Sequence, residues 1–490
     1  MKNLNKIYLL VVGISLFSCN NLIDLKPESV ISVNSFWKTE EDAQGGLVGM
    51  YNQFRTFVRT DLILLGEARS EVMGNGTANA DYRIKYFENS MTQSNADRNW
   101  LQLYRVVNYA NLVIKYVPAI SFKNEATKNA TIAQAYSMRA YVYFLMVRTW
   151  GALPIITEPV EGYDPVTTYK LRSPAEEILT FIKSDIVKGN ALYPGNTFNA
   201  TRSFWSKPAL NMLKAEVYLW TAKRLNGGNA DFTAALAALN EAELSDLALQ
   251  NNFADVFAYT NKGNKEILFA SHFADLEASD NYFADMYTST PTASDGITPD
   301  IIAAIGAGGG NNWWAPTALI RNQFTEDDSR RKASFLEIYM TKNGATTFST
   351  SIVLKGKGFV TGGVRKFLDD IIIYRYADLL LLKAEAKNAL GQDPSTEINK
   401  VRRRAYGEAF SKHTFINGSQ PANDEAILQE RLFELAFEGK RWWDLIRFNK
   451  AFEKVPSLKG KEANQYLLLW PLTLQTMSLN SKLVQNPGYN

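Results

Sequence analysis

Three glutamates in the stretch ERLFELAFEGKRWWDLIRF (residues 430–448) have the spacing of a possible catalytic site. In a helix, Glu430, Glu434 and Glu438 are four residues apart and therefore lie on one face. A glycosidase needs two carboxyl groups roughly 5–10 Å apart, one of them with a raised pKa. Glu434 and Glu438 meet that distance if one helical turn separates them. The stretch is therefore either a catalytic acid pair or a structural ion-pair network.

Nearby arginines favour the structural alternative. Arg402, Arg403 and Arg404 lie one short helix upstream, and Arg431 and Arg441 are also close in sequence. We expect guanidinium forks to hold the glutamates in a partly buried network, with Gly439 ending the helix. Arginines that contact a carboxyl group lower its pKa, so that it can no longer act as the general acid. We therefore predict that the chain is not an enzyme and that these glutamates are not catalytic.

A second constellation consists of aromatic rings beside polar side chains. Two insertions, residues 74–99 and 280–316, are rich in Gly, Asn, Ser and Thr and carry aromatic residues without helical periodicity. Such long loops are uncommon in a compact domain unless they are functional. Exposed flat rings beside Arg, Asn or Asp suit the faces and hydroxyls of sugars. The candidate ligand contacts are Trp313, Trp314, Tyr282 and Tyr287 in the later insertion, and Asp81, Tyr82, Arg83 and Tyr86 in the earlier one.

The alternative for these aromatic residues is that their rings pack the loops onto the scaffold. Metal and thiol chemistry are not indicated, because His272 and His413 lack acidic or histidine neighbours at ligand spacing and Cys19 is the only cysteine. Asp327 and Asp328 could suggest calcium. We favour an exposed acidic turn beside the two following arginines, and expect no metal and no cofactor.

The N-terminus predicts export and lipid anchoring. Lys2 and Lys6 precede an apolar run over residues 7–17, which is about half the length of a membrane-spanning helix. The run ends in LFSC, which resembles the lipobox of bacterial lipoproteins. Residues 1–18 are therefore the predicted signal peptide and Cys19 the acylated first residue, anchored without a transmembrane helix. The alternative is an ordinary cleaved signal that leaves a spare thiol.

Charge excludes one class of partner. Without the two lysines of the signal peptide, 51 basic residues face 50 acidic ones, so the mature chain has a net charge of about +1. Nucleic-acid binding needs a strongly basic face, and we therefore expect no nucleic-acid partner. With 490 residues and 46% apolar content, the chain can bury a large core.

Helical periodicity dominates the remaining sequence. The expected helices lie within residues 36–58, 100–117, 130–151, 174–189, 208–225, 232–244, 374–391 and 395–407. Several share a rhythm of small residues, for example Ala135, Arg139, Ala140 and Tyr143, then Ala209, Leu213, Ala215 and Tyr218, then Ala377, Leu381, Ala384 and Ala386. Small residues at this spacing let paired helices approach closely, as in tetratricopeptide-like hairpins. Because the spacing between these units is irregular, we predict a mostly α, helical-hairpin scaffold interrupted by long irregular loop insertions.

Taken in order, these segments resemble the SusD/RagB family of surface lipoproteins from Bacteroidetes. The segments that carry the resemblance are NLIDLKPES after the cysteine, WLQLYRVVNYANLVI, RAYVYFLMVRTWGALPII, KPALNMLKAEVYLW, YRYADLLLLKAEAKNALG with INKVRRRAYG, ERLFELAFEGKRWWDLIRF and the final NPGY. One departure is WPLTLQT (residues 470–476), where the family usually has a Pro-Ile-Pro turn followed by an acid.

The resemblance implies four tetratricopeptide-like hairpins in a single domain over residues 19–490, with an N-terminal region (20–225) and a C-terminal region (265–490). It also implies a lipid-anchored, cell-surface location on the outer membrane. The implied function is capture of an oligosaccharide or polysaccharide and its delivery to a SusC-like TonB-dependent transporter. The first alternative is peptide capture, as in the RagB branch, and the second is a lipid-anchored glycoside hydrolase.

Overall fold

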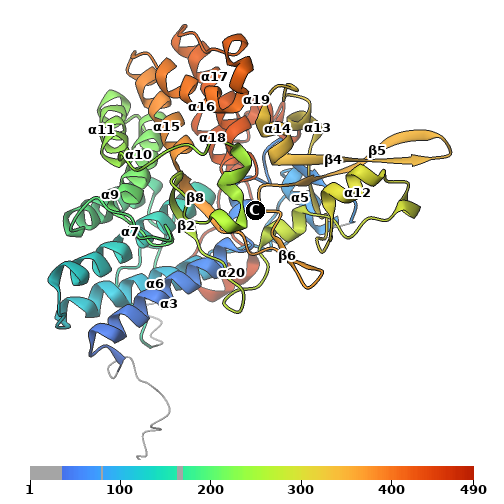
Figure 1. Cartoon of the computed structure of the whole chain (residues 1–490). Helices are drawn as coiled ribbons and strands as arrows, with labels where there is room; N and C mark the ends of the chain where they lie inside the picture. Colours follow the sequence, from blue (N-terminus) through green and yellow to red (C-terminus); the bar gives the residue numbers. More distant parts are fainter. Residues whose placement is uncertain (1–35, 79–80, 163–168, 490) are drawn as a thin grey trace, which may run out of the picture.

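Helices packed in consecutive pairs form the frame of the molecule (Figure 1). The computed structural model describes residues 36–78, 81–162 and 169–489, so the predicted signal peptide and Cys19 lie outside the described residues. Within these ranges four pairs follow one another: α3 (Glu40–Val58) with α6 (Leu101–Tyr116), α7 (Glu125–Trp150) with α9 (Ala175–Leu192), α10 (Lys207–Arg224) with α11 (Gly228–Ala242), and α15 (Tyr376–Ala389) with α17 (Gln420–Leu435). The predicted mostly α fold built on helical hairpins is confirmed.

Successive pairs also contact each other, through α6 and α7, α9 and α10, and α11 and α15, and α16 (Ser395–Tyr406) packs on α15. Small residues permit this close approach. Ala135 and Ala140 of α7, Ala209 of α10 and Ala384 of α15 are all fully buried. One large apolar cluster runs through the helix pairs and under both insertions. Within the described ranges, no helix combines the length and the apolar character that crossing a bilayer requires.

Four small antiparallel sheets, which the sequence pattern did not predict, are set among the helices. Each has two strands: β1 (Met73–Asn75) with β3 (Trp314–Pro316), β2 (Ile267–Ser271) with β8 (Ile371–Arg375), β4 (Phe335–Lys342) with β5 (Ala345–Val353), and β6 (Phe359–Thr361) with β7 (Val364–Lys366). The β4–β5 hairpin projects from the body (Figure 1). Asn343 and Gly344 at its tip both have positive φ, which is the requirement of a tight hairpin turn.

Short helices fill the connections and the insertions. They are α4 (Leu62–Gly66), α5 (Asp81–Phe87), α12 (Pro299–Ile305), α13 (Ala318–Arg321), α14 (Ser329–Ser334), α18 (Arg441–Arg447), α19 (Ala451–Lys454) and α20 (Leu474–Leu479). The 3₁₀ turns are η1 (Val117–Ala119), η2 (Phe253–Phe257), η3 (Tyr259–Asn261), η4 (Tyr282–Met286), η5 (Ala293–Asp295), η6 (Gly407–Lys412), η7 (Pro456–Leu458) and η8 (Gln465–Leu468). The insertions are therefore less irregular than predicted, since α5 lies in the first and α12 in the second.

Candidate functional site

The two insertions, far apart in sequence, form one region of the surface. Strand β1 at the start of the first insertion pairs with β3 at the end of the second, with Asn75 opposite Trp314. The backbone N–H of Thr77 donates to Asn312 Oδ1 over 2.8 Å. Gly76 approaches the same asparagine so closely that a Cβ there would lie 1.9 Å from the Asn312 carbonyl oxygen. The structure thus brings together the two segments in which ligand contacts were predicted.

Arg83 of α5 is the centre of this region. Its guanidinium carbon lies 4.0 Å from the ring centroid of Trp313, 4.8 Å from that of Trp314 and 5.2 Å from that of Tyr82. Its Nε donates a 2.9 Å hydrogen bond to the Tyr82 hydroxyl. Cation–π contacts of this kind contribute about 0.5–2 kcal/mol, more when they are desolvated, and Arg83 is buried. Arg83 therefore fixes the positions of the rings that surround it.

Two of these rings remain accessible to a ligand. Tyr82 is 53% exposed, and Trp313 is half-buried. Beside them, Asp285 forms an ion pair with Arg83 at 3.4 Å and accepts a 3.0 Å hydrogen bond from Nδ2 of the exposed Asn311. We call these five residues, Tyr82, Arg83, Asp285, Asn311 and Trp313, the ring patch.

Asp285 and Asn311 were not among the predicted contacts. Both lie in the second insertion, but that segment carries many polar residues, and only the tertiary contacts of Asp285 with Arg83 and Asn311 distinguish this pair. Burial raises the pKa of Asp285 above its ordinary value, against the opposing effects of Asn311 and Arg83. The patch therefore offers ring faces, a carboxylate and an amide side by side, which are the groups that sugar hydroxyls and ring faces require.

Four of the six candidate rings are buried, as the alternative interpretation of loop packing expected. Trp314 is 3% exposed, because its place in β3 turns the ring inward, where it stacks on Tyr86 at 6.2 Å and meets the edge of Phe87 at 5.1 Å. Tyr86 is itself buried, and its hydroxyl donates to Asp97. These two rings attach the insertions to the core.

Tyr282 and Tyr287 are also buried. The Tyr287 hydroxyl donates a 2.8 Å hydrogen bond to the Ile305 carbonyl, and Arg365 covers its ring at 4.6 Å. Both tyrosines therefore follow the alternative interpretation, in which rings pack the loop onto the scaffold. Asp81 begins α5, but its side chain lies outside the described part of the chain.

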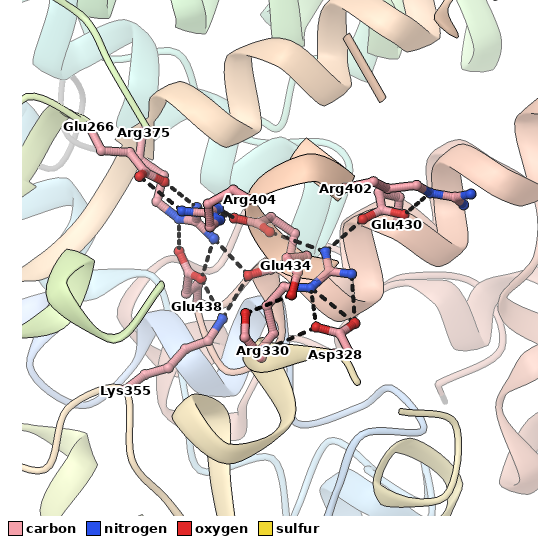
Figure 2. A network of polar contacts seen from close by, with 12 residues as sticks. Glu266, Asp328, Arg330, Lys355, Arg375, Arg402, Arg404, Glu430, Glu434 and Glu438 are labelled. Carbon is pink, nitrogen blue, oxygen red and sulfur yellow. Dashed lines mark hydrogen bonds and ion pairs between the residues drawn. The ribbon is translucent and has the colours of Figure 1, made fainter. Parts of the chain in front are cut away.

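The three glutamates that suggested catalysis lie in a buried ion-pair network (Figure 2). Arg402 donates to Glu430 over 2.7 Å, and Arg404 donates to Glu434. The predicted arginine network is confirmed for these two arginines. Arg403 is exposed and takes no part.

Three further cations of the network come from distant segments. Arg330 of α14 contacts Glu430 at 2.6 Å, and Lys355 contacts Glu438 at 2.7 Å. Arg375, at the end of β8, reaches Glu434 at 2.7 Å and holds Glu438 with a fork of 2.8 and 2.9 Å. We call the three glutamates together with their five cations the carboxylate network; these cations are Arg330, Lys355, Arg375, Arg402 and Arg404.

Two arginines within the stretch pair elsewhere. Arg431 binds Asp378 and Asp444, each at 2.8 Å, and Arg441 binds Glu71 at 2.6 Å. The expectation that they join the network is therefore wrong.

The predicted end of the helix at Gly439 is also wrong, because α17 ends at Leu435. Phe437 has a φ of 69°, and the chain then turns so that Glu438, although outside the helix, still contacts Arg375, which also binds Glu434.

Glu434 and Glu438 do not suit the role of a general acid. Burial alone would raise the pKa of Glu434, but the guanidinium groups of Arg404, Arg375 and Arg330 hold it well below its ordinary value. The pKa of Glu438 is likewise lowered, because Arg375 and Lys355 outweigh the effect of burial. Both carboxylates remain ionised and are shielded from water, whereas a glycosidase acid must hold a proton near neutral pH. The geometry supports a structural role.

The acidic pair after α13 differs from the prediction. Asp328 is buried, not exposed: its carboxylate caps α14 through the Arg330 N–H at 3.0 Å and binds the Arg330 guanidinium at 2.7 Å. Asp327 is exposed and lies 2.8 Å from Nε2 of His413. Among the residues that the structure describes, no three His, Cys, Asp or Glu side chains are placed to hold a metal ion.

Comparison with known proteins relates the chain to one family. The model of the SusD family matches residues 341–489, and a model described as starch-binding and associating with the outer membrane matches residues 24–219. A SusD-like protein from Formosa agariphila is 27% identical over 526 residues, covering 100% of this chain and 99% of that protein. The starch-binding protein SusD from Bacteroides thetaiotaomicron is 28% identical over 127 residues, 24% of this chain and 22% of that protein.

The fold agrees with these matches. The structure of NanU from B. fragilis superimposes with a TM-score of 0.82 and 31% sequence identity, covering 95% of this chain and 100% of NanU. Since the identity extends over nearly the whole length of both proteins, the chain belongs to the SusD/RagB family.

Proposed function

We propose that this protein captures a glycan at the cell surface and delivers it to a SusC-like TonB-dependent transporter of the outer membrane. The observation that carries the proposal is the ring patch, where the accessible rings of Tyr82 and Trp313 stand beside Asp285 and Asn311. A sugar ring can stack on these aromatic faces while its hydroxyls bond to the carboxylate and the amide.

The family supports the choice of ligand. One matching model is described as starch-binding, and one relative is itself named a starch-binding protein. The same model is described as associating with the outer membrane, and the LFSC sequence at residues 16–19 supports attachment through an acylated Cys19. Delivery to a transporter is supported by the family resemblance.

Binding can be tested on the soluble form that lacks residues 1–19. A glycan array identifies the ligand, and titration calorimetry then measures its Kd for Tyr82→Ala and Trp313→Ala. We expect each substitution to weaken binding about tenfold, equivalent to about 1.4 kcal/mol. Tyr218→Ala on α10, which removes a partly buried ring far from the patch along the chain, is the matched control and should leave the Kd unchanged.

Each alternative function predicts a different result. Glycan affinity that is unchanged in both ring variants would contradict the patch as the binding surface. Binding of peptides without any glycan affinity would favour the peptide-capture alternative. Release of shorter sugars from a bound glycan would favour the hydrolase.

The anchor is tested separately in the full chain. Cys19→Ser should move the protein out of the membrane fraction, because the thiol that receives the lipid is lost. A membrane-bound Cys19→Ser variant would contradict lipid anchoring while leaving the ligand-binding proposal untouched.

A further inference from the structure

A cleft with a volume of about 820 Å³ lies between the loop at residues 247–251 and one face of α16. Its lining residues are Leu247, Ala248, Leu249, Gln250, Asn251, Tyr376, Ser395, Thr396, Asn399, Lys400, Arg403 and Arg404. None of them belongs to the ring patch. The volume lies within the range of about 300–1,000 Å³ that is typical of small-ligand sites.

Helix α16 presents a fixed polar face to this cleft. Thr396, Asn399, Lys400 and Arg403 follow each other at intervals of three, one and three residues, so their side chains share one side of the helix. The other side carries buried apolar residues, among them Val401. Packing against the core therefore determines which side chains face the cleft.

The cleft carries two exposed cations, of which Lys400 shares the Tyr376 hydroxyl with Glu243 and helps to lower the pKa of that carboxyl. Lys400 and Arg403 are both exposed, and neither forms an ion pair with a residue in the described ranges. Lys400 instead donates to the Tyr376 hydroxyl, and Arg403 covers the ring of Phe410 at 4.7 Å. Like charges three residues apart on a helix repel each other by a few tenths of a kcal/mol. An anion bound between them would remove this repulsion.

Arg404 adds a buried donor to the same wall. Its side chain is only 4% exposed, and its terminal nitrogens bind Glu266 and Glu434. Its Nε, however, has no hydrogen-bond partner among the described residues. No carboxylate is among the lining residues, while the amides of Gln250 and Asn251 form the facing wall.

From this arrangement we propose that the cleft is a second ligand site, which binds an acidic saccharide segment through its carboxylate or sulfate groups. Arginine forks bind such planar or multi-oxygen anions with two hydrogen bonds. The amides and hydroxyls of Gln250, Asn251 and Thr396 match the hydroxyls of the sugar that carries the anion. The site is independent of the ring patch, and its ligand differs from a neutral glycan in charge.

Titration calorimetry on the soluble form tests the proposal with three probes: a dextran sulfate oligosaccharide, a polygalacturonate oligomer, and a neutral dextran of the same length as the first. In Lys400→Gln/Arg403→Gln, binding of at least one acidic probe should weaken about tenfold or more. The affinity for neutral dextran should not change. Both substituted side chains are exposed, so the melting temperature should stay the same.

Lys123→Gln/Lys188→Gln is the matched control, because it removes two exposed charges outside the cleft, one in the connection before α7 and one on α9. It should change the affinity for the acidic probes less than about twofold. Trp313→Ala should also leave their binding unchanged, which separates this cleft from the ring patch.

The two acidic probes distinguish sulfate from carboxylate recognition, and binding of either supports the proposal. Three results would overturn it. The first is that both double variants weaken the binding of the acidic probes equally, and the second is that Lys400→Gln/Arg403→Gln binds these probes with full affinity. The third is that neither acidic probe binds the unsubstituted protein.

Discussion

The carboxylate network and the ring patch both set arginines against carboxylates, but the two regions differ in their contact with water. In the network, Glu434 is fully buried, and three arginines satisfy it. In the patch, two of the rings that cover Arg83, those of Tyr82 and Trp313, remain accessible, and its single carboxylate partner lies at 3.4 Å. The same residue types thus stabilise the fold in one place and offer ligand contacts in the other, because burial decides what they contact.

The strongest test of this comparison removes one charge from the network. Glu434→Gln leaves the guanidinium groups of Arg330, Arg375 and Arg404 with less compensation in a site that excludes water. Removing one partner of a buried pair costs about 3–5 kcal/mol, and we expect this loss in the free energy of unfolding, measured by urea denaturation.

The control for that experiment is Glu277→Gln. This glutamate pairs with Arg55 at 3.5 Å, and its side chain is 60% exposed. Exposed pairs contribute about 0–1 kcal/mol, so the control should remain close to the unsubstituted protein. Similar losses for the two variants would mean that burial does not separate the roles of these carboxylates.

Acid should weaken the buried ion pairs. Burial alone would raise the pKa of Glu385, but Arg447 and Lys223 lower it from 4.5 to about 2. A lowered carboxyl pKa stabilises the fold at pH values above 4.5, and this contribution is lost as the pH falls from about 4.5 toward 2. The shift corresponds to a contribution on the order of 3 kcal/mol.

Denaturation curves at several pH values measure this effect. The stability difference between the unsubstituted protein and Glu385→Gln should be largest near neutral pH and shrink as the pH falls below about 4.5. Glu277→Gln serves again as the exposed control, and its difference should stay nearly constant. A constant difference for Glu385→Gln would contradict the ion-pair origin of the shift.

Substitutions at an exposed ring of the ring patch should change stability much less than those in the carboxylate network. Tyr82→Ala removes a side chain that is 53% exposed, so we expect it to reduce the free energy of unfolding by less than about 1 kcal/mol. A much larger loss, seen by the same denaturation method, would mean that Tyr82 is part of the scaffold and not of a binding surface.

A small effect is also expected for Arg83→Lys. Lysine keeps the charge but lacks the flat guanidinium that contacts three rings, and the loss of stacking should cost about 0.5–1 kcal/mol of stability. Arg105→Lys, at an exposed arginine of α6, should change nothing measurable. If Arg83→Lys were as stable as the unsubstituted protein, Arg83 would not hold the rings in place.

The local sequence predicted the helical scaffold, part of the carboxylate network and part of the ring patch. Periodicity and small residues indicated the helix pairs, and the four-residue spacing of glutamates beside arginines indicated the network. Arg330, Lys355 and Arg375 were missed, because they are more than fifty residues away in sequence from the glutamates that they bind. Asn343 and Gly344 carry a hairpin signal that helical periodicity does not detect.

The neighbouring tryptophans at 313 and 314 show most directly what the local sequence could not predict. The sequence places both in the same aromatic, glycine-rich insertion, and nothing local separates them. Successive residues of an extended chain point to opposite sides, so the Trp314 ring is buried in the core while the Trp313 ring stays partly exposed, although both contact Arg83. Pairing of β3 with β1 decides which of the two is buried.

By itself, the sequence determined the helical scaffold, the family, and the segments that would carry rings and charges, since these depend on residue types and short-range spacing. Only the tertiary structure decided which rings meet water, which cations neutralise Glu434 and Glu438, and which face of α16 is left with unpaired charge. These outcomes depend on contacts between segments far apart in the chain, and burial at those contacts sets both the accessibility of a ring and the free energy of a charge.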